Sequence, residues 1–438
     1  MKPKFSQFNL LTIVIGALGL VAPSVTLAAA GDLDPAFGRG GLARTDFADT
    51  DEYGYAVKVQ PDGKIVVAGQ SGIYPLFHAA LARFHPNGRL DSTFGIGGKT
   101  TAALDAGGDG VSAIAFQSDG KIVTAGLALH DNSALAFIVG RFNPDGSLDQ
   151  SFGNNGSVKT TFGDVSAQGD DVIVQSDGKI IVVGTTGAGS YSDLNDFALA
   201  RYNSDGSLDQ SFGQGGKVTT HFPGIDNTGS RATSAILQRD GKLLVAGSYV
   251  NQGVPNAFAL ARYSPNGSLD RTFGNSGLVT TRIGLGDALA FGLILQEDGR
   301  IVLAGYSATT QDNDFTLACY NPNGSLDTTF GNAGVTTTNF SASTDDIAYS
   351  IALQRDGKLV VGGKTGDYPE QDLALARYTS NGILDPAFGA GGIIATDFGS
   401  IELGFGVAIQ HDGKILLSGG VFGRKDNFDM AVACYLGR

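Results

Sequence analysis

Seven Asp-Gly pairs recur along this chain at spacings of 56 to 63 residues, and this repetition constrains the fold more than any other feature. A glutamine stands two residues before each pair, and a lysine follows it, or Arg300 in one copy. An apolar run such as residues 65–68 comes next. A period of this length is typical of repeat architectures in which each copy is one supersecondary unit. The seven pairs are Asp62 and Gly63, Asp119 and Gly120, Asp177 and Gly178, Asp240 and Gly241, Asp298 and Gly299, Asp356 and Gly357, and Asp412 and Gly413.

Two further motifs recur in the same order in each copy. The motif L-D-x-x-F-G-x-x-G occurs seven times, and a segment close to A-L-A-R-Y precedes it in most copies. Each copy resolves into four predicted strands, a to d, which in the first copy cover residues 55–60, 64–69, 78–85 and 98–104. The Asp-Gly pair predicts a tight type I′ turn between strands a and b, in which both central residues adopt positive φ.

The b strand is apolar throughout, which indicates that both of its faces are buried. A glycine six residues after each Asp-Gly glycine, such as Gly69, indicates crowding between neighbouring sheets. Four-stranded units packed face to face are the blades of a β-propeller. The chain begins on a d-type strand, residues 41–47, and ends on a c-type strand, residues 429–435. We therefore expect an all-β, seven-bladed β-propeller of four-stranded antiparallel blades, closed by the N-terminal strand, which completes the last blade and covers its edge. An open solenoid or two smaller domains is the alternative.

The first 30 residues have the pattern of a secretory signal peptide. Lys2 and Lys4 precede an apolar segment, residues 10–21, and Ala28-Ala29-Ala30 is a typical cleavage site. The apolar segment is shorter than the roughly 20 residues that a membrane-spanning helix needs, although a retained anchor is the alternative. We expect a signal peptide over residues 1–30, a single propeller domain over residues 31–438, and no membrane insertion after cleavage. The protein would then be periplasmic, exposed on the cell surface, or extracellular.

The net charge argues against nucleic acid as a binding partner, and the positions of the two cysteines argue against a disulfide. The formal net charge is −13 and the pI about 4.7, so the basic surface that nucleic-acid binding requires is missing. Cys319 and Cys434 occupy the same strand-c position in blades five and seven. Blade six separates them, which exceeds the Cα–Cα limit of about 7 Å for a disulfide. We expect two free thiols.

The three motifs together resemble the bacterial delta-60 repeat family of predicted β-propeller proteins. The resemblance covers residues 31–438 and implies the fold, but it implies no shared reaction or ligand. This chain departs from the pattern at Cys319 and Cys434, which replace an arginine, at Ala102, which replaces a threonine, and at Arg300, which replaces a lysine.

The aspartate of the L-D-x-x-F-G motif is expected to hold the c–d loop through backbone amides. A pairing of this aspartate with the strand-c arginine is disfavoured, since Asp327 persists in the copy that carries Cys319. The seven aspartates are Asp34, Asp91, Asp149, Asp209, Asp270, Asp327 and Asp385.

The two faces of the propeller should differ. Strand direction alternates, so the a–b turns and c–d loops share one face, built from the recurrent motifs, while the b–c and d–a loops share the other. The b–c loops differ in every copy, which is typical of a binding surface on a rigid scaffold, although unconstrained loops are the alternative. Acidic residues are expected on this face at the start of strand c (Asp196, Asp314, Asp372, Asp429) and of strand a (Asp170, Asp171, Asp287, Asp346, Glu402).

Four blades carry an acid at both positions. Strands a and c of one blade lie about 9.6 Å apart, so two such carboxylates leaning inward could approach the oxygen spacing of a calcium site. The alternative is that they solvate strand ends. No cofactor is required, and calcium remains an open possibility.

Catalytic motifs are missing from the sequence. The five histidines occupy unrelated repeat positions, and neither H-E-x-x-H nor a nucleophile elbow occurs. The leading hypothesis is an exported, non-enzymatic scaffold that binds a protein, peptide or glycan through its variable acidic face. The alternative is a propeller hydrolase or lyase with axial carboxylates, assisted or not by calcium. A deep axial pocket with converging carboxylates would favour the enzyme, and a flat or plugged axis the scaffold.

Overall fold

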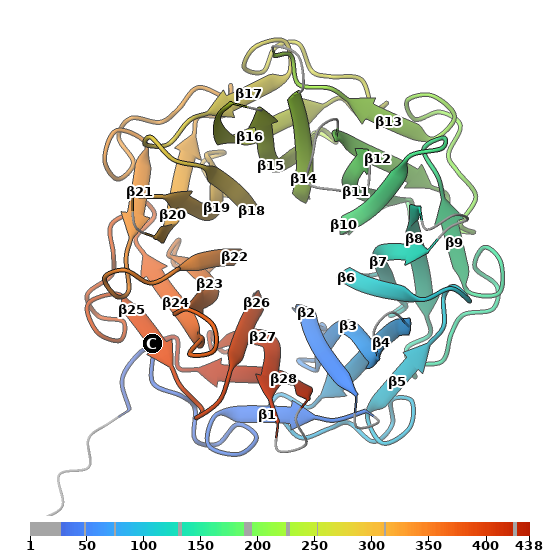
Figure 1. Cartoon of the computed structure of the whole chain (residues 1–438). Helices are drawn as coiled ribbons and strands as arrows, with labels where there is room; N and C mark the ends of the chain where they lie inside the picture. The colour runs from blue at the N-terminus through green and yellow to red at the C-terminus, as the bar shows by residue number, and fades with distance from the viewer. Residues whose placement is uncertain are drawn as a thin grey trace, which may run out of the picture.

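The structure is a computed structural model that describes residues 28–47, 50–73, 76–129, 134–187, 195–224, 228–251, 253–310, 312–423 and 427–438. Seven four-stranded antiparallel sheets surround a central axis, so the fold is the expected seven-bladed β-propeller (Figure 1). In the described residues all regular structure is β. Blades 1 to 4 consist of β2 (Asp51–Val59), β3 (Ile65–Ile73), β4 (Leu76–Phe84) and β5 (Lys99–Ala102); β6 (Asp109–Phe116), β7 (Ile122–Leu129), β8 (Leu135–Phe142) and β9 (Ser157–Thr160); β10 (Ser166–Val174), β11 (Ile180–Gly187), β12 (Asp196–Tyr202) and β13 (Lys217–Thr220); and β14 (Thr228–Leu237), β15 (Leu243–Asn251), β16 (Val254–Tyr263) and β17 (Leu278–Thr281). Blades 5 to 7 consist of β18 (Ala288–Leu295), β19 (Ile301–Ala308), β20 (Asn313–Tyr320) and β21 (Val335–Thr338); β22 (Ile347–Leu353), β23 (Leu359–Thr365), β24 (Asp372–Tyr378) and β25 (Ile393–Thr396); and β26 (Glu402–Ile409), β27 (Ile415–Phe422), β28 (Phe428–Tyr435) and β1 (Leu42–Thr45).

The N-terminal strand closes the ring as expected. β1 pairs antiparallel with β28, with Leu42 opposite Ala433 and Thr45 opposite Met430. The predicted signal peptide lies outside the described residues except for residues 28–30. Ala30 already packs on blade 6, since its carbonyl accepts a hydrogen bond from the amide of Gly389 at 3.0 Å. Both ends of the described part of the chain are therefore held by blades 6 and 7.

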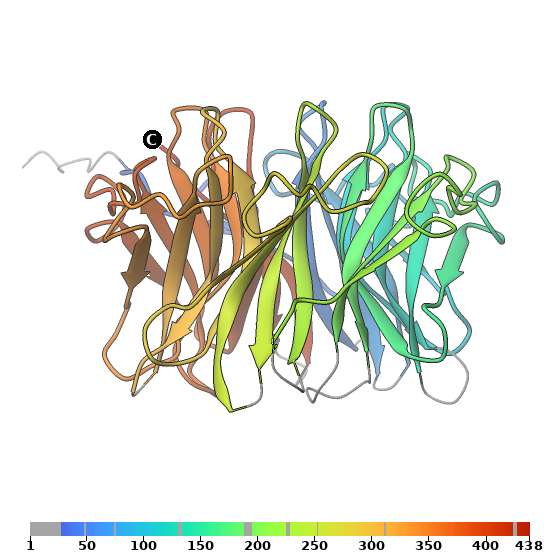
Figure 2. The same cartoon turned by 90° about the horizontal axis from the view of Figure 1, so that it is seen from above.

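The loops that connect the strands lie on two opposite faces of the disc, which Figure 2 shows edge-on. On one, which we call the motif face, the Asp-Gly turn lies against the c–d loop of its own blade, as Gly63 does against Pro86. The b–c and d–a loops form the opposite face, which we call the variable face. In the part of the chain that the structure describes, no helix is long and apolar enough to cross a membrane.

The Asp-Gly turn is not the predicted type I′ turn. Gly63 has a φ of +84°, whereas Asp62 does not have positive φ. The amide of Gly63 donates to Gln60 O, and the amide of Gln60 to Lys64 O, which is the pattern of a type I turn followed by a left-handed glycine. The same turn recurs in the other six copies, which have no proline there, so its cause is the loop length. Three residues separate Gln60 from Lys64, and a three-residue hairpin loop takes a type I turn followed by a left-handed residue.

The central b strands are buried on both faces, and Val66 and Val67 of β3 are fully inaccessible. The recurrent b-strand glycine has a different cause from the predicted crowding between sheets. A Cβ on Gly69 would overlap the carbonyl oxygen of Tyr53, which lies on strand a of the same blade. Strand a approaches closely there because it contains a β-bulge.

The aspartate of the L-D-x-x-F-G motif does bind the strand-c arginine, contrary to the sequence-based expectation. Arg83 Nε donates to Asp91 Oδ2 at 2.8 Å, the guanidinium lies 4.6 Å from the ring centroid of Phe94, and Nη1 donates to Pro144 O of the next blade. The expected backbone contact is also present, from Thr93 N to Asp91 Oδ1 at 3.1 Å. The same Arg–Asp pair recurs in blades 2, 3, 4 and 6.

In blades 1 to 4 and 6 the lysine before strand b binds this aspartate together with the arginine, as Lys64 Nζ does at 3.2 Å from Asp91 Oδ2. In blades 5 and 7 the cation before strand b remains as its charged partner. Arg300 Nη1 lies 3.4 Å from Asp327 Oδ2 where Cys319 replaces the arginine, and Lys414 Nζ lies 3.1 Å from Asp34 Oδ2 where Cys434 does so. The persistence of Asp327 therefore does not exclude the pairing elsewhere. Both cysteines are free and buried, as predicted. Burial raises the pKa of each thiol to about 12, so neither is a reactive thiolate at neutral pH.

Candidate functional site

The innermost strand of every blade carries one β-bulge at the same repeat position. The bulged residue is left out of the pairing with strand b, and a bulge re-aims its side chain. All seven bulged residues line the central channel, which has a volume of about 650 Å³. They are Tyr55, Ser112, Asp170, Thr233, Phe291, Tyr349 and Phe405. Each blade thus places the side chain of its bulged residue in the lining of the central channel.

Four of these residues form a continuous aromatic arc along blades 1, 7, 6 and 5. Ring centroids are 5.0 Å apart for Tyr55 and Phe405, 5.5 Å for Phe405 and Tyr349, and 5.2 Å for Tyr349 and Phe291. These spacings are typical of favourable aromatic pairs. All four side chains are half-buried, so ring surface remains accessible in the channel. We call this set the aromatic arc.

The opposite wall of the channel is polar, with Ser112, Asp170 and Thr233 at the equivalent positions of blades 2 to 4. Only 11% of the Asp170 side chain is exposed. Its Oδ1 accepts a hydrogen bond from Gln168 Nε2 at 2.9 Å and lies 3.5 Å from the guanidinium of Arg231, whereas Oδ2 has no partner. Burial raises the pKa of Asp170 to about 6. A carboxyl group that titrates near neutrality in a cavity is a candidate functional group.

Asp170 and Asp171 do not lie at the start of strand a on the variable face, where the sequence placed them. Both lie in the middle of β10 and line the channel. Asp171 Oδ1 accepts from Val172 N at 2.8 Å, and Oδ2 accepts from Ala235 N of blade 4 at 2.9 Å. Asp171 therefore joins two blades, whereas Asp170 keeps one oxygen that is buried and has no hydrogen-bond partner.

The acids at the start of strand c do lie on the variable face, and three of them have partners from their own blade. Asp196 Oδ1 lies 2.9 Å from His221 Nδ1. Asn339 Nδ2 donates to Asp314 Oδ1 at 2.8 Å. In blade 7, Arg44 Nη2 lies 3.2 Å from Asp429 Oδ2. Asp372 is the exception.

The acids at the start of strand a contact the preceding blade and not strand c of their own blade, so the predicted within-blade pairs are wrong. Asp287 Oδ1 accepts from Asn256 N of blade 4 at 2.7 Å. The amide of Glu402 donates to Gln371 O of blade 6 at 2.8 Å. The physical reason is that strand a of one blade packs against strand c of its neighbour, whereas strand b separates a from c within a blade.

Asp346 and Glu402 belong to a set of fully buried acids that sequence reasoning recognised only in part. Glu52 and Asp109 occupy the same repeat position, ten residues before the aspartate of the Asp-Gly pair. These side chains bind the d–a loop, as when Leu104 N donates to Asp109 Oδ2 at 2.9 Å and Phe340 N to Asp346 Oδ2 at 2.7 Å. Burial raises the pKa of all four, that of Asp346 to about 6.

These shifts predict that the protein is more stable near pH 5 than near pH 7.5. The folded state holds the protons of Asp170 and Asp346 more tightly than the unfolded state, so their contribution is complete at low pH and is lost as pH rises through about 6. The aspartates bound to arginine have lowered pKa values, and their contribution is lost only as pH falls below about 4. Melting temperatures across this range check the prediction.

The variants Asp170→Asn and Asp62→Asn serve as test and control for this pH dependence. Asp170→Asn should reduce the difference between the two melting temperatures, because it removes one titrating group. Asp62→Asn, at an exposed turn, should leave the difference unchanged. A melting temperature that rises steadily from pH 5 to 7.5 would contradict the assignment.

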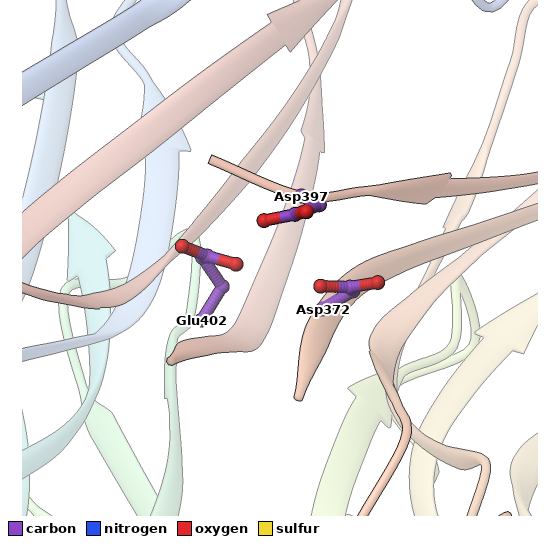
Figure 3. A group of neighbouring side chains, drawn as sticks. All are labelled: Asp372, Asp397 and Glu402. Carbon is purple, nitrogen blue, oxygen red and sulfur yellow. The ribbon is translucent and has the colours of Figure 1, made fainter. Parts of the chain in front are cut away.

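A second cavity, of about 860 Å³, lies on the variable face between blades 6 and 7. Asp372, Asp397 and Ser400 contribute to its lining, together with Arg44. Asp372 and Asp397, with Glu402, form the one group of three acidic, histidine or cysteine side chains close enough to share a metal ion among the described residues (Figure 3). Sequence reasoning missed Asp397, which follows β25 in a d–a loop that no motif marks. The bulged residues were also missed, although each lies seven residues before the aspartate of an Asp-Gly pair.

Comparison with known proteins agrees with the repeat. Six segments match the family model of the domain of unknown function DUF5122, a beta-propeller: residues 60–94, 117–152, 175–212, 238–273, 296–330 and 354–388. Each segment begins at the glutamine that precedes the Asp-Gly pair and ends at the phenylalanine of the L-D-x-x-F motif. A seventh would begin at Gln410 and continue through the chain ends to Phe37. No curated protein is similar to the chain in sequence.

Solved structures of similar shape are distant in sequence. The polysaccharide lyase Uly1 is 13% identical with a TM-score of 0.51, and the alignment covers 92% of this chain and 93% of that one. A PL25 ulvan lyase bound to -[GlcA(1-4)Rha3S]- is 11% identical with a TM-score of 0.50, covering 90% and 94%. At such identities the likeness concerns the fold alone.

Proposed function

Because this chain is a repeat β-propeller protein, we propose that it is a binding module that holds a saccharide chain in its central channel. The observation that carries the proposal is the aromatic arc facing a polar wall. A cavity of several hundred cubic ångströms with aromatic walls and a few polar groups is typical of ligand sites.

The chemistry of the two walls suits a sugar. A pyranose ring has apolar C–H faces, which stack on aromatic rings, and a rim of hydroxyl groups, which form hydrogen bonds. Tyr349 and Phe405 offer the ring surface, and the polar residues of blades 2 to 4 line the opposite wall of the channel.

We predict that the purified protein binds short oligosaccharides and that Phe405→Ala weakens binding at least tenfold. Loss of a central aromatic contact costs about 1.4 kcal/mol or more, which is the free-energy equivalent of that factor. A panel of neutral and acidic oligosaccharides, followed by isothermal titration calorimetry with the best binder, measures this. Tyr368→Ala, on an exposed b–c loop of blade 6, is the matched aromatic control and should bind as the unaltered protein does.

The opposite effect of the two variants would place the binding site elsewhere on the protein. If Tyr368→Ala weakens binding and Phe405→Ala does not, the ligand sits on the variable loops, where the sequence alone placed a protein, peptide or glycan partner. Binding of unrelated peptides with higher affinity than any saccharide would refute the saccharide class.

A hydrolase or lyase is the second candidate, and the raised pKa of Asp170 is the observation that favours it. Two of the similar solved structures are polysaccharide lyases. The geometry favours binding over catalysis, because both Asp171 oxygens are occupied by backbone amides and Asp170 has no second free carboxylate beside it. Cleavage of a bound oligosaccharide that Asp170→Asn abolishes would reverse this preference.

We also propose export of the chain and its membership of the delta-60 repeat family. Residues 1–30 support export by their signal-like pattern, and the three repeat motifs support the family. The saccharide would then belong to the cell envelope or its surroundings. The intact mass of the protein recovered outside the cytoplasm tests export, and a mass that includes residues 1–30 would contradict cleavage.

A further inference from the structure

The carboxylates of Asp372, Asp397 and Glu402 meet on the variable face, away from the central channel. Asp372 is the first residue of β24, Asp397 follows β25, and Glu402 is the first residue of β26, so blades 6 and 7 both contribute. One oxygen of each lies within 4.8 Å of the others, and Figure 3 shows the three groups turned toward one another. Three negative groups at this separation repel one another unless a cation lies between them.

Glu402 adds an independent observation, because it is fully buried and only half satisfied. Its Oε1 accepts hydrogen bonds from Ser400 N at 3.1 Å and from Ser400 Oγ at 2.6 Å. Its Oε2 has no hydrogen-bond partner, which is also true of Oε2 of Glu52 at the same repeat position in blade 1. A buried carboxylate oxygen without a partner is costly, so this oxygen is free to serve as a ligand.

Blade 6 differs from blades 3 and 5 in the side chain that faces its strand-c aspartate. At the same pair of repeat positions, blade 3 sets His221 against Asp196, and blade 5 sets Asn339 against Asp314. In both, the strand-c aspartate has a donor. Blade 6 places Asp397 at the donor position, so an acid faces Asp372.

Blade 7 supplies a positive charge of its own. Asp429 is bound there by Arg44 of β1, whose guanidinium also donates to the carbonyls of Val421 and Phe422. The residue in blade 6 at the position of Arg44 is Ala395, since both lie opposite the equivalent strand-c alanine. Blade 6 thus has the acids without the arginine.

We propose that Asp372, Asp397 and Glu402 bind one divalent cation, and that calcium fits best. Calcium takes oxygen ligands at about 2.3–2.6 Å, so oxygens on its sphere lie up to about 5.2 Å apart, and the three carboxylate oxygens lie within 4.8 Å of one another. Magnesium usually keeps several waters and binds one or two carboxylates, so a site of three carboxylates suits calcium better. The site goes beyond the proposed saccharide binding and does not depend on it.

Calcium titration of the full exported chain, after removal of metals with EDTA, tests the proposal. We expect saturable binding at one site by isothermal titration calorimetry. The melting temperature should rise by about 2–4 °C at a calcium concentration about 100 times the dissociation constant.

Asp397→Asn is the informative variant, because it copies the Asn339 arrangement of blade 5 and changes an exposed residue. It should weaken calcium binding at least tenfold. In EDTA it should melt at or above the temperature of the unaltered protein, since the new amide gives Asp372 a donor. Asp314→Asn, at the matched strand-c position of blade 5, is the control and should leave calcium binding unchanged.

Two results would overturn the inference. One is the lack of any binding heat and of any melting shift up to about 10 mM calcium, the weak end of extracellular calcium sites. The other is an unchanged calcium response in Asp397→Asn. Equal affinity for magnesium would overturn the choice of calcium.

Discussion

Removal of residues 1–47 is expected to abolish the stable ring. The deletion takes away β1, bares the edge of β28, and removes Phe37, Leu42 and Ala43, all of which are buried. A buried Phe alone is worth about 3–5 kcal/mol, and an exposed strand edge pairs with other chains. The truncated chain should therefore aggregate, or melt at least about 10 °C below the full protein. Light scattering and calorimetry measure both outcomes.

A circular permutant separates the loss of the strand from the loss of closure. The two ends lie side by side, since Gly31 N donates to Leu436 O at 2.7 Å. A short linker from Arg438 to Ala28, with new ends opened between Gly107 and Gly108 of a d–a loop, keeps all four strands of blade 7 in one continuous segment. This permutant should fold. A truncated chain that melts with the full protein would show that the ring does not need its closure.

Arg377→Cys is expected to cost about 3–5 kcal/mol, the range for breaking a buried ion pair. The Arg377 side chain is 2% exposed and its Nε donates to Asp385 at 2.9 Å. Its Nη1 donates to Gly437 O, next to the C-terminus, and the guanidinium lies 4.5 Å from the ring centroid of Phe388. One side chain thus joins blade 6, the c–d loop and the chain end. Urea unfolding of the full chain measures the loss.

The chain itself suggests a compensating change. Blade 5 combines Cys319 with Arg300, so the double variant Arg377→Cys with Lys358→Arg should recover about 1–2 kcal/mol of the loss, as coupled neighbours do. Lys358→Arg alone should be nearly neutral. A double-mutant cycle with no coupling would show that Arg300 does not replace the lost arginine in blade 5.

The fold was predictable because its signal is repeated. Asp62 and its six equivalents mark the blades independently of any one copy, and the order of motifs at the chain ends predicts the pairing of β1 with β28. Errors arose where one copy was judged alone. Asp327 seemed to argue against an Arg–Asp pair, yet it keeps the strand-b cation that binds this aspartate in every blade. The three-residue loop between Gln60 and Lys64 selects a type I turn that the Asp-Gly pair alone did not indicate.

The candidate sites were less predictable because they are the positions at which the repeat varies. Tyr55 and Asp170 occupy one position in the blade, but they differ in chemistry, so no motif marks them. Asp397 lies in a loop, and its contact with Glu402 comes from the packing of two blades. The sequence singled out Asp372 and Glu402 as acids but assigned them to within-blade pairs, which strand b prevents.

The seven bulges have a consequence for how such a protein can change. A bulged residue takes no part in the pairing of strands a and b, and it lies outside the fully buried layers between blades. Substitution there alters the lining of the axis with little cost to the blade that carries it. The four rings of the aromatic arc touch one another and are coupled, whereas the three polar positions lie outside the arc. Selection, or a protein engineer, can therefore vary recognition in small steps while the scaffold keeps its stability.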